Sequence, residues 1–440
     1  MKKRMKILAL LQRLCFPCVI GGVLGLIFAC SDDGNGGNKW DKPYDPSLPV
    51  KITSFTPDSG GMTTEMIIRG ENLGNDPKAV KVYFNKKQAA VVSTRGDMLY
   101  AITPRLPGDT CVISVVIGKD SVSLDDRFRY FTTTRVTTIS GHPNRDSVAN
   151  GLLISAAFKD PRFLTIDAQD NIFVCEWSNQ AIRRINMEKG EVTTLIGEGG
   201  MIGGSPNAPD VDSDGKVVIV PMDSKFTFYE FDPERLWEAK KFEMLKADDS
   251  DNFTCEWKHG VASCQIDGMM YTRSHAGEII KFDPKTKKAW LVSRDIETGN
   301  DSFLAFHPSK PELLYISLYN SKKIGIFNVQ TKEYKQYSNG IYGYQDGDIK
   351  DARFKELQQI TFDADGNLYV ADAGNRCIRR ISPDGIVTTV VGLPNEDAGY
   401  KDGDPSEALF KWPSGVAVDS EGTVYVADRD NNCIRKLSIE

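Results

Sequence analysis

A short sequence motif that occurs more than once indicates the fold of this protein. Residues 365–375 read DGNLYVADAGN, and residues 421–431 read EGTVYVADRDN. In both, a Gly-containing turn precedes a short apolar run that ends at an Asp, and an Ile-Arg pair begins three residues after the Asn. Turn residues on both sides of a β-branched and aromatic run predict a strand bounded by polar turns.

The same register extends upstream. Three copies align without gaps on Phe158, Phe354 and Phe410, each with an Asn-Gly or Asp-Gly pair eight residues earlier. More degenerate copies between residues 214 and 327 bring the number to six, spaced by about 44–56 residues, and each reads as four short strands. Six four-stranded repeats predict a six-bladed β-propeller over residues 134–440.

A separate strand is expected to close this ring. Residues 136–141 read VTTISG and mirror VTTLIG at 192–197 and VTTVVG at 387–392, which end two of the repeats. The last repeat holds three strands, so residues 136–141 are expected to supply its fourth. Such closure would hide an exposed sheet edge.

Residues 49–133 have a different pattern. Seven short alternating stretches, broken by Gly, Asn, Asp and Pro, predict an immunoglobulin-like β-sandwich. They are Ile52–Phe55, Met66–Arg69, Val80–Phe84, Ala90–Ser93, Leu99–Thr103, Val112–Ile117 and Phe128–Phe131.

Two families share these motifs. The runs at 365–379 and 421–435 closely resemble NHL repeats, and ITSFTPDSGG at 52–61 with IIRGENLG at 67–74 resembles the start of an IPT/TIG domain. The resemblance implies an all-β chain in which an immunoglobulin-like IPT/TIG sandwich, a spacer or interaction module, precedes a six-bladed NHL β-propeller.

The N-terminus reads as a targeting segment. Residues 1–13 are basic, residues 14–29 are apolar, and the run ends at Ala29-Cys30, which resembles a bacterial lipobox. We expect a signal peptide over 1–29, lipidation of Cys30 and a lipidated, flexible tether over 30–48; an ordinary signal peptide is the alternative. Ser31-Asp32-Asp33 resembles the surface-export signal of lipoproteins in glycan-utilising Gram-negative gut bacteria, which implies a lipid anchor in the outer membrane, facing the cell exterior.

Charge argues against one class of partner. The 440 residues carry a formal charge of −6, and residues 1–29 hold five Lys or Arg and no acidic residue, so the remainder carries −11. We therefore expect no binding to nucleic acid.

Candidate ligand-binding residues come from one face of the propeller. The turn after each second strand and the loop before each first strand should share this face, called the top face below. On this face, several blades carry aromatic, basic or imidazole side chains at positions where the regular repeats have other residues. Sugar rings and peptides bind to side chains of these kinds. The candidates are Arg162, Trp177, Trp257, His259, Arg273, His275, Tyr319, Trp412 and Arg429; packing between blades is the alternative for each.

The order of anchor, spacer and propeller resembles the auxiliary nutrient-binding proteins of bacterial glycan-uptake systems. It implies non-catalytic capture of a nutrient, foremost a glycan, on the top face, together with an outer-membrane transporter complex. Two alternatives stay open: a calcium-dependent lactonase or zinc-dependent lyase type of propeller enzyme, and a protein-interaction scaffold. We assign no catalytic residue, metal ligand or cofactor; calcium at the Asp346-Gly347-Asp348 and Asp402-Gly403-Asp404 loops is a weaker interpretation than ordinary turns.

Overall fold

The computed structural model describes residues 42–104, 110–131, 134–145, 147–197, 203–394 and 396–439. These residues form strands and three short 3-10 turns, η1 (Pro233–Arg235), η2 (Ala373–Asn375) and η3 (Arg429–Asn431). Among them no helix has the length and apolarity to cross a membrane. The expected signal peptide, Cys30 and the tether up to residue 41 lie outside the described residues.

The N-terminal domain is an eight-stranded sandwich. Its sheet order is β1-β3-β6-β5-β4-β7-β8-β2, and it folds on itself at β5, which pairs with both β4 and β6. The strands are β1 (Lys51–Thr56), β2 (Ser59–Gly60), β3 (Glu65–Glu71), β4 (Val80–Phe84), β5 (Lys87–Thr94), β6 (Met98–Ile102), β7 (Thr110–Ile117) and β8 (Asp120–Tyr130). The last strand, β8, begins at Asp120, well before the predicted Phe128. Its early positions are largely polar and lie outside the core, so they lack the apolar alternation on which the prediction depended.

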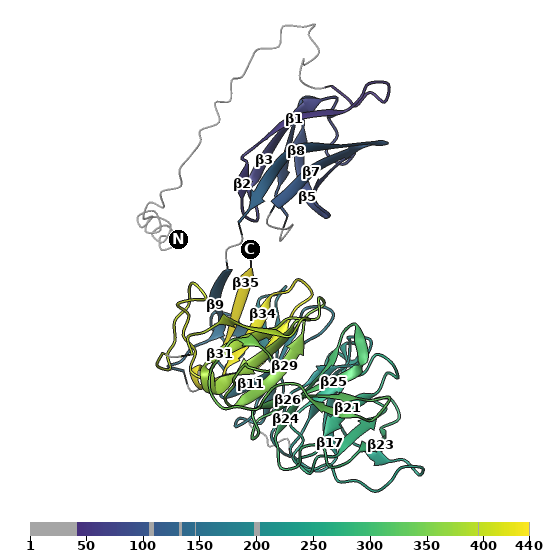
Figure 1. The fold of residues 1–440 in the computed structure, drawn as a ribbon, viewed down its shortest axis with the longest axis vertical. Helices are drawn as coiled ribbons and strands as arrows, with labels where there is room; N and C mark the ends of the chain where they lie inside the picture. The colour runs from purple at the N-terminus through teal and green to yellow at the C-terminus, as the bar shows by residue number, and fades with distance from the viewer. Residues whose placement is uncertain are drawn as a thin grey trace, which may run out of the picture.

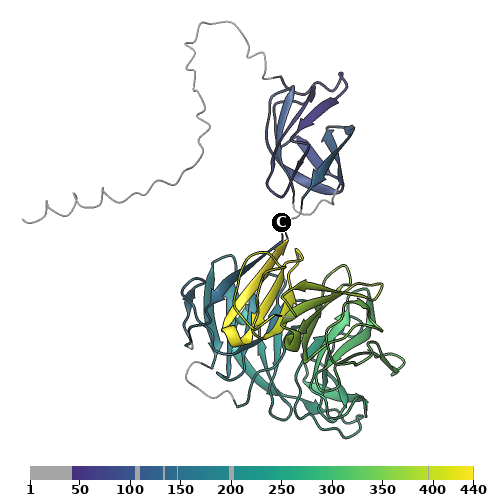
Figure 2. The same ribbon diagram turned by 60° about the vertical axis from the view of Figure 1, so that its left-hand side comes forward.

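The C-terminal domain is a six-bladed β-propeller (Figures 1 and 2). From the axis outward, blade 1 holds β11 (Pro161–Ile166), β12 (Ile172–Glu176), β13 (Ala181–Asn186), β14 (Glu191–Ile196) and β10 (Gly151–Leu152). Blade 2 holds β15 (Asp210–Val211), β16 (Val218–Pro221), β17 (Thr227–Phe231) and β18 (Ala239–Glu243). Blade 3 holds β20 (Val261–Ser263), β21 (Met270–Arg273), β22 (Ile279–Phe282), β23 (Lys288–Ser293) and β19 (Leu245–Lys246).

The remaining blades complete the ring. Blade 4 holds β24 (Ser302–His307), β25 (Lys310–Leu318), β26 (Lys323–Asn328) and β27 (Tyr334–Gln336). Blade 5 holds β29 (Leu357–Phe362), β30 (Leu368–Asp372), β31 (Cys377–Ile381), β32 (Ile386–Val391) and β28 (Gly347–Asp348). Blade 6 holds β33 (Pro413–Val418), β34 (Val424–Asp428), β35 (Cys433–Ile439) and β9 (Thr134–Gly141). Blades 1, 3 and 5 thus carry a fifth short strand that the four-stranded pattern did not predict.

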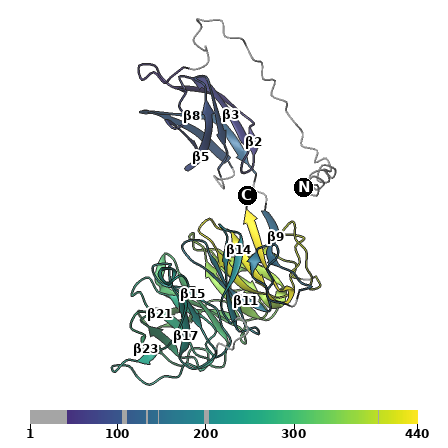
Figure 3. The ribbon, with the colours of Figure 1, turned by 180° about the vertical axis from the view of Figure 1, so that it is seen from behind.

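The strand β9 joins the two ends of the ring. It pairs antiparallel with β35, with Val136 opposite Leu437 and Gly141 opposite Cys433. Figures 1 and 3 show both strands side by side at the part of the propeller nearest the sandwich. The segment expected to complete the last blade therefore lies beside its third strand.

A buried arginine organises each of the three regular blades. In blade 6, the guanidinium of Arg435 lies 3.3 Å from Asp428 Oδ2 and 2.9 Å, through Nε, from Asp402 Oδ1. The same group sits 4.7 Å from the ring centroid of Phe410. Asp402 also accepts a hydrogen bond from Thr138 N of β9 at 2.9 Å, so this cluster connects the loop, the second and third strands and the closing strand.

The other two regular blades repeat this cluster. In each, the arginine contacts the carboxylate that ends the second strand, a side chain of the incoming loop, and the phenylalanine ring. The sets are Arg379, Asp372, Asp346 and Phe354 in blade 5, and Arg183, Glu176, Asn150 and Phe158 in blade 1. The Asp-Gly turns and Ile-Arg pairs of the repeat register therefore meet in space, and the carboxylates of Asp346 and Asp402 have protein donors.

Arg435→Met is expected to lower the free energy of unfolding by about 3–5 kcal/mol, because it leaves the buried Asp428 carboxylate without its countercharge. Lys401→Met, which removes the exposed ion pair with Glu407, is expected to change it by less than about 1 kcal/mol. Urea unfolding followed by tryptophan fluorescence measures both. Equal effects of the two substitutions would contradict the assigned role of Arg435.

Candidate functional site

Eight of the nine candidate residues line one cavity of about 590 Å³, called the upper cavity below. They are Arg162, Trp177, Trp257, His259, His275, Tyr319, Trp412 and Arg429. Asn207 of the loop before blade 2 and Gln358 of blade 5 line it as well, so all six blades contribute. Side chains from the predicted top-face positions therefore meet around one opening.

Two arginines from adjacent blades form one side of the upper cavity. Asp160 Oδ1 lies 3.0 Å from Arg162 Nε and 3.7 Å from Arg429 Nε. Asp430 accepts a hydrogen bond from Arg429 Nε at 2.7 Å. Both guanidinium groups are thus fixed through Nε, and we call this pair the arginine side.

The three candidate tryptophans differ in how much of each ring is open to a ligand. The guanidinium of Arg162 lies 4.0 Å from the ring centroid of Trp177, and that of Arg429 lies 5.0 Å from that of Trp412. Arginine planes therefore already cover part of these two rings. Trp257 is 59% exposed and adopts φ 53°, a left-handed conformation that is unusual for a bulky residue. It is the cavity's most exposed aromatic surface.

Two imidazoles and one carboxylate form the opposite side, between blades 3 and 4. Asp301 Oδ1 lies 3.2 Å from His275 Nδ1 and 3.5 Å from His259 Nε2. Burial lowers the pKa of His259, so its ring is neutral at pH 7. We call this group the imidazole side. In the part of the chain that the structure describes, no three His, Cys, Asp or Glu side chains are placed so that they could hold a metal ion.

The upper cavity has an apolar floor. Phe163 of blade 1 and Phe303 of blade 4 are buried, and their ring centroids lie 5.1 Å apart across the propeller axis. Below them, Gln359 of blade 5 makes two hydrogen bonds to the backbone of Leu164 in blade 1, one of them from Leu164 N at 2.9 Å. A second cavity of about 340 Å³ at the other end of the axis shares no lining residue with the first.

Two family descriptions match the chain. An IPT/TIG domain matches residues 49–130, and an NHL repeat matches residues 410–437. The sandwich thus matches an IPT/TIG domain, and blade 6 of the propeller matches an NHL repeat.

Solved structures and curated sequences resemble the chain. A Bacteroides thetaiotaomicron protein of unknown function is 25% identical with a TM-score of 0.74, over 90% of this chain and 100% of that one. An auxiliary nutrient binding protein from the same organism is 26% identical with a TM-score of 0.61, over 90% and 99%. The chloroplastic protein SUPPRESSOR OF QUENCHING 1 of Arabidopsis thaliana is 23% identical over 315 residues, 68% of this chain, which spans 27% of that protein's length.

Arg273, the ninth candidate, does not line the upper cavity of the propeller. It is buried and donates hydrogen bonds to Asn300 O at 2.9 Å, Ser302 Oγ at 3.1 Å and Ile296 O at 3.1 Å. Its place at the end of β21 directs the side chain between blades 3 and 4, where loop carbonyls need donors. Arg273 therefore lies away from the other eight candidates, and its contact with a ligand stays a prediction.

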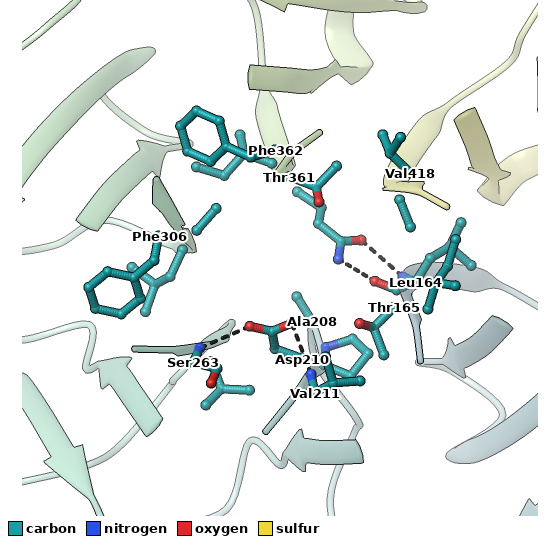
Figure 4. A pocket seen from close by; sticks show the side chains of 18 of the residues that line it. Leu164, Thr165, Ala208, Asp210, Val211, Ser263, Phe306, Thr361, Phe362 and Val418 are labelled. Atoms are coloured by element: carbon teal, nitrogen blue, oxygen red, sulfur yellow. Dashed lines mark hydrogen bonds between the residues drawn. The ribbon is translucent and has the colours of Figure 1, made fainter. Parts of the chain in front are cut away.

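The second cavity, called the lower cavity, was not predicted from the sequence (Figure 4). Asp210 of blade 2 lies at its wall and accepts hydrogen bonds from Ser263 N and Val211 N, both at 2.9 Å. Burial raises the pKa of Asp210 to about 6. Blade 2 is one of the degenerate repeats, so no register position distinguished this Asp from a turn residue.

Arg273→Met is expected to destabilise the propeller by about 2–4 kcal/mol, because several buried carbonyls lose their donor. It should leave ligand affinity at the upper cavity unchanged within twofold at temperatures where the variant is folded. Thermal unfolding and calorimetric titration measure the two effects. Loss of affinity without loss of stability would restore Arg273 as a ligand contact.

Asp210 is expected to make stability depend on pH. An Asp in an unfolded chain titrates near pH ~3.9, so the folded propeller holds this proton more tightly. The contribution of Asp210 to the free energy of unfolding is therefore largest below about pH 4 and declines as the pH rises toward 6. Unfolding of the wild type should show this decline and Asp210→Asn should lack it, while Asp384→Asn at an exposed position should behave like the wild type.

Proposed function

We propose that this chain is a non-catalytic surface lipoprotein that captures a saccharide nutrient in the upper cavity and supplies it to an outer-membrane uptake system. The observation that carries the proposal is the convergence of eight top-face side chains on one closed-bottomed cavity. The similarity to a protein named as an auxiliary nutrient binding protein supports the same role.

The chemistry of the upper cavity suits a saccharide. Its volume of about 590 Å³ lies within the range of small-molecule sites. An exposed indole at Trp257 offers an apolar face to a sugar ring, while Tyr319, Gln358 and His275 offer polar groups to its hydroxyls. Burial raises the pKa of Tyr319, so its hydroxyl remains a hydrogen-bond donor at neutral pH.

The remaining segments fit a capture role at the cell surface. Cys30 would carry the lipid anchor and residues 30–48 would act as a tether, as the sequence predicts. The IPT/TIG domain then acts as a spacer that separates the propeller from the anchor. A transporter complex in the same membrane would receive the captured saccharide.

Trp257→Ala is expected to weaken saccharide binding about tenfold or more, because the exposed indole is the main surface on which a sugar ring can stack. Trp290→Ala is the matched control, since Trp290 lies in β23 with its indole nitrogen bonded to Asp249, outside the upper cavity. Titration calorimetry with xylo-oligosaccharides, galacto-oligosaccharides and oligogalacturonides measures the affinities.

Product analysis of the same mixtures tests the non-catalytic part of the proposal. We expect saturable binding with the saccharides recovered intact. Cleaved or eliminated products would overturn the capture role in favour of an enzyme, and undiminished binding by Trp257→Ala would overturn the assignment of the site.

A further inference from the structure

The arginine side of the upper cavity has unused hydrogen-bonding capacity. Arg162 bonds Asp160 through Nε, and Arg429 bonds Asp430 through Nε. The terminal nitrogens of both guanidinium groups make no hydrogen bond to any described residue, although both side chains are only 25% exposed. Each arginine therefore presents two partly desolvated NH₂ groups at the wall of the cavity.

These two cations are held in place before any ligand arrives. Their Nε atoms lie within 4 Å of one oxygen of Asp160, and each guanidinium lies over a tryptophan ring. Asp160 lies between the two cations and Asp430 pairs with Arg429. The free terminal nitrogens, rather than an excess of positive charge, would therefore attract an added anion. Because the side chains are already fixed, little conformational entropy is lost when the anion binds.

The imidazole side favours hydroxyl groups over anionic groups of a ligand. Asp301 carries a negative charge that repels an anion, and its carboxylate accepts hydrogen bonds well from hydroxyl groups. Blades 1 and 6 adjoin, blades 3 and 4 adjoin, and the two pairs lie across the ring from each other. A ligand that spans the cavity therefore needs an anionic group at one end and hydroxyl groups at the other.

The floor of the upper cavity adds a geometric restriction. The Phe163–Phe303 contact and the hydrogen bonds between Gln359 and Leu164 occupy the axis below the cavity. A polymer cannot pass from the upper cavity to the lower one without breaking these contacts. A saccharide that enters along the axis therefore enters with one end first, and that end lies above the apolar rings.

We infer that the upper cavity binds the terminal residue of an acidic saccharide, a uronic acid whose carboxylate lies between Arg162 and Arg429 and whose hydroxyls face Asp301 and His275. This inference rests on the proposed capture of a saccharide and specifies its class. The carboxylate provides a planar pair of acceptors that matches the fork of donors on each guanidinium.

The test compares oligogalacturonides with galacto-oligosaccharides of the same length, by titration calorimetry on the purified protein. The acidic series should bind at least tenfold more tightly, and added salt should weaken it more than the neutral series. Arg162→Gln and Arg429→Gln should each weaken the acidic series about tenfold, a typical effect for one charge-assisted pair. Arg380→Gln, an exposed arginine of β31, is the control with the same charge change and should stay within twofold.

Further arms separate the possible failures. Thermal unfolding checks that each variant is folded, and Arg162→Lys, which keeps the charge but not the fork, should show an intermediate loss. Equal binding of neutral and acidic oligosaccharides, or acidic binding that survives both Gln substitutions, would overturn the acidic class and leave saccharide capture standing. Binding of oligoglutamate peptides in preference to both saccharide series, or no binding by either series, would overturn the capture proposal itself.

Discussion

The buried arginine of the regular blades is the interaction on which the upper cavity depends. The carboxylates held by Arg183 and Arg435 end the second strands of blades 1 and 6. Trp177 follows the first of these carboxylates directly and Arg429 follows the second, while Asp428 also accepts a hydrogen bond from Trp412 N at 3.1 Å. The clusters that stabilise these blades therefore also fix the aromatic and basic side chains of the arginine side.

In the degenerate blades, buried cations also fix the loops around the upper cavity, but they bind backbone carbonyls instead of carboxylates. Lys258 is fully buried and donates to the carbonyls of Met222 and Ser224 at 2.6 Å, and Arg273 donates to the carbonyls between blades 3 and 4. His259 follows the first cation and His275 lies two residues after the second. Buried cations therefore fix the loops on both sides of the cavity, with carboxylate partners on one side and backbone carbonyl partners on the other.

The sequence predicted the fold better than it predicted the contacts within the site. Recurrence of Asn-Gly or Asp-Gly, Phe and Ile-Arg at fixed intervals identified three blades, because each repeated residue has equivalent partners in each regular blade. Degenerate copies of the same strand pattern indicated the other three. The orientation of Arg273, the arginine planes over Trp177 and Trp412, and the parts played by Asp160 and Asp301 depend on contacts between loops that have no common period. Lipidation of Cys30 and the outer-membrane location stay predictions, since that segment lies outside the described residues.

The pairing of β9 with β35 has a consequence for how the molecule assembles. Thr138 and Asp402, which hydrogen bond at this junction, are separated by 264 residues of chain. Contacts between such distant residues form slowly, because the chain loses the entropy of closing a long loop before the contacts can stabilise the fold. The ring therefore cannot close until every intervening blade has been synthesised, and β9 presents an unpaired strand edge to its surroundings throughout that interval.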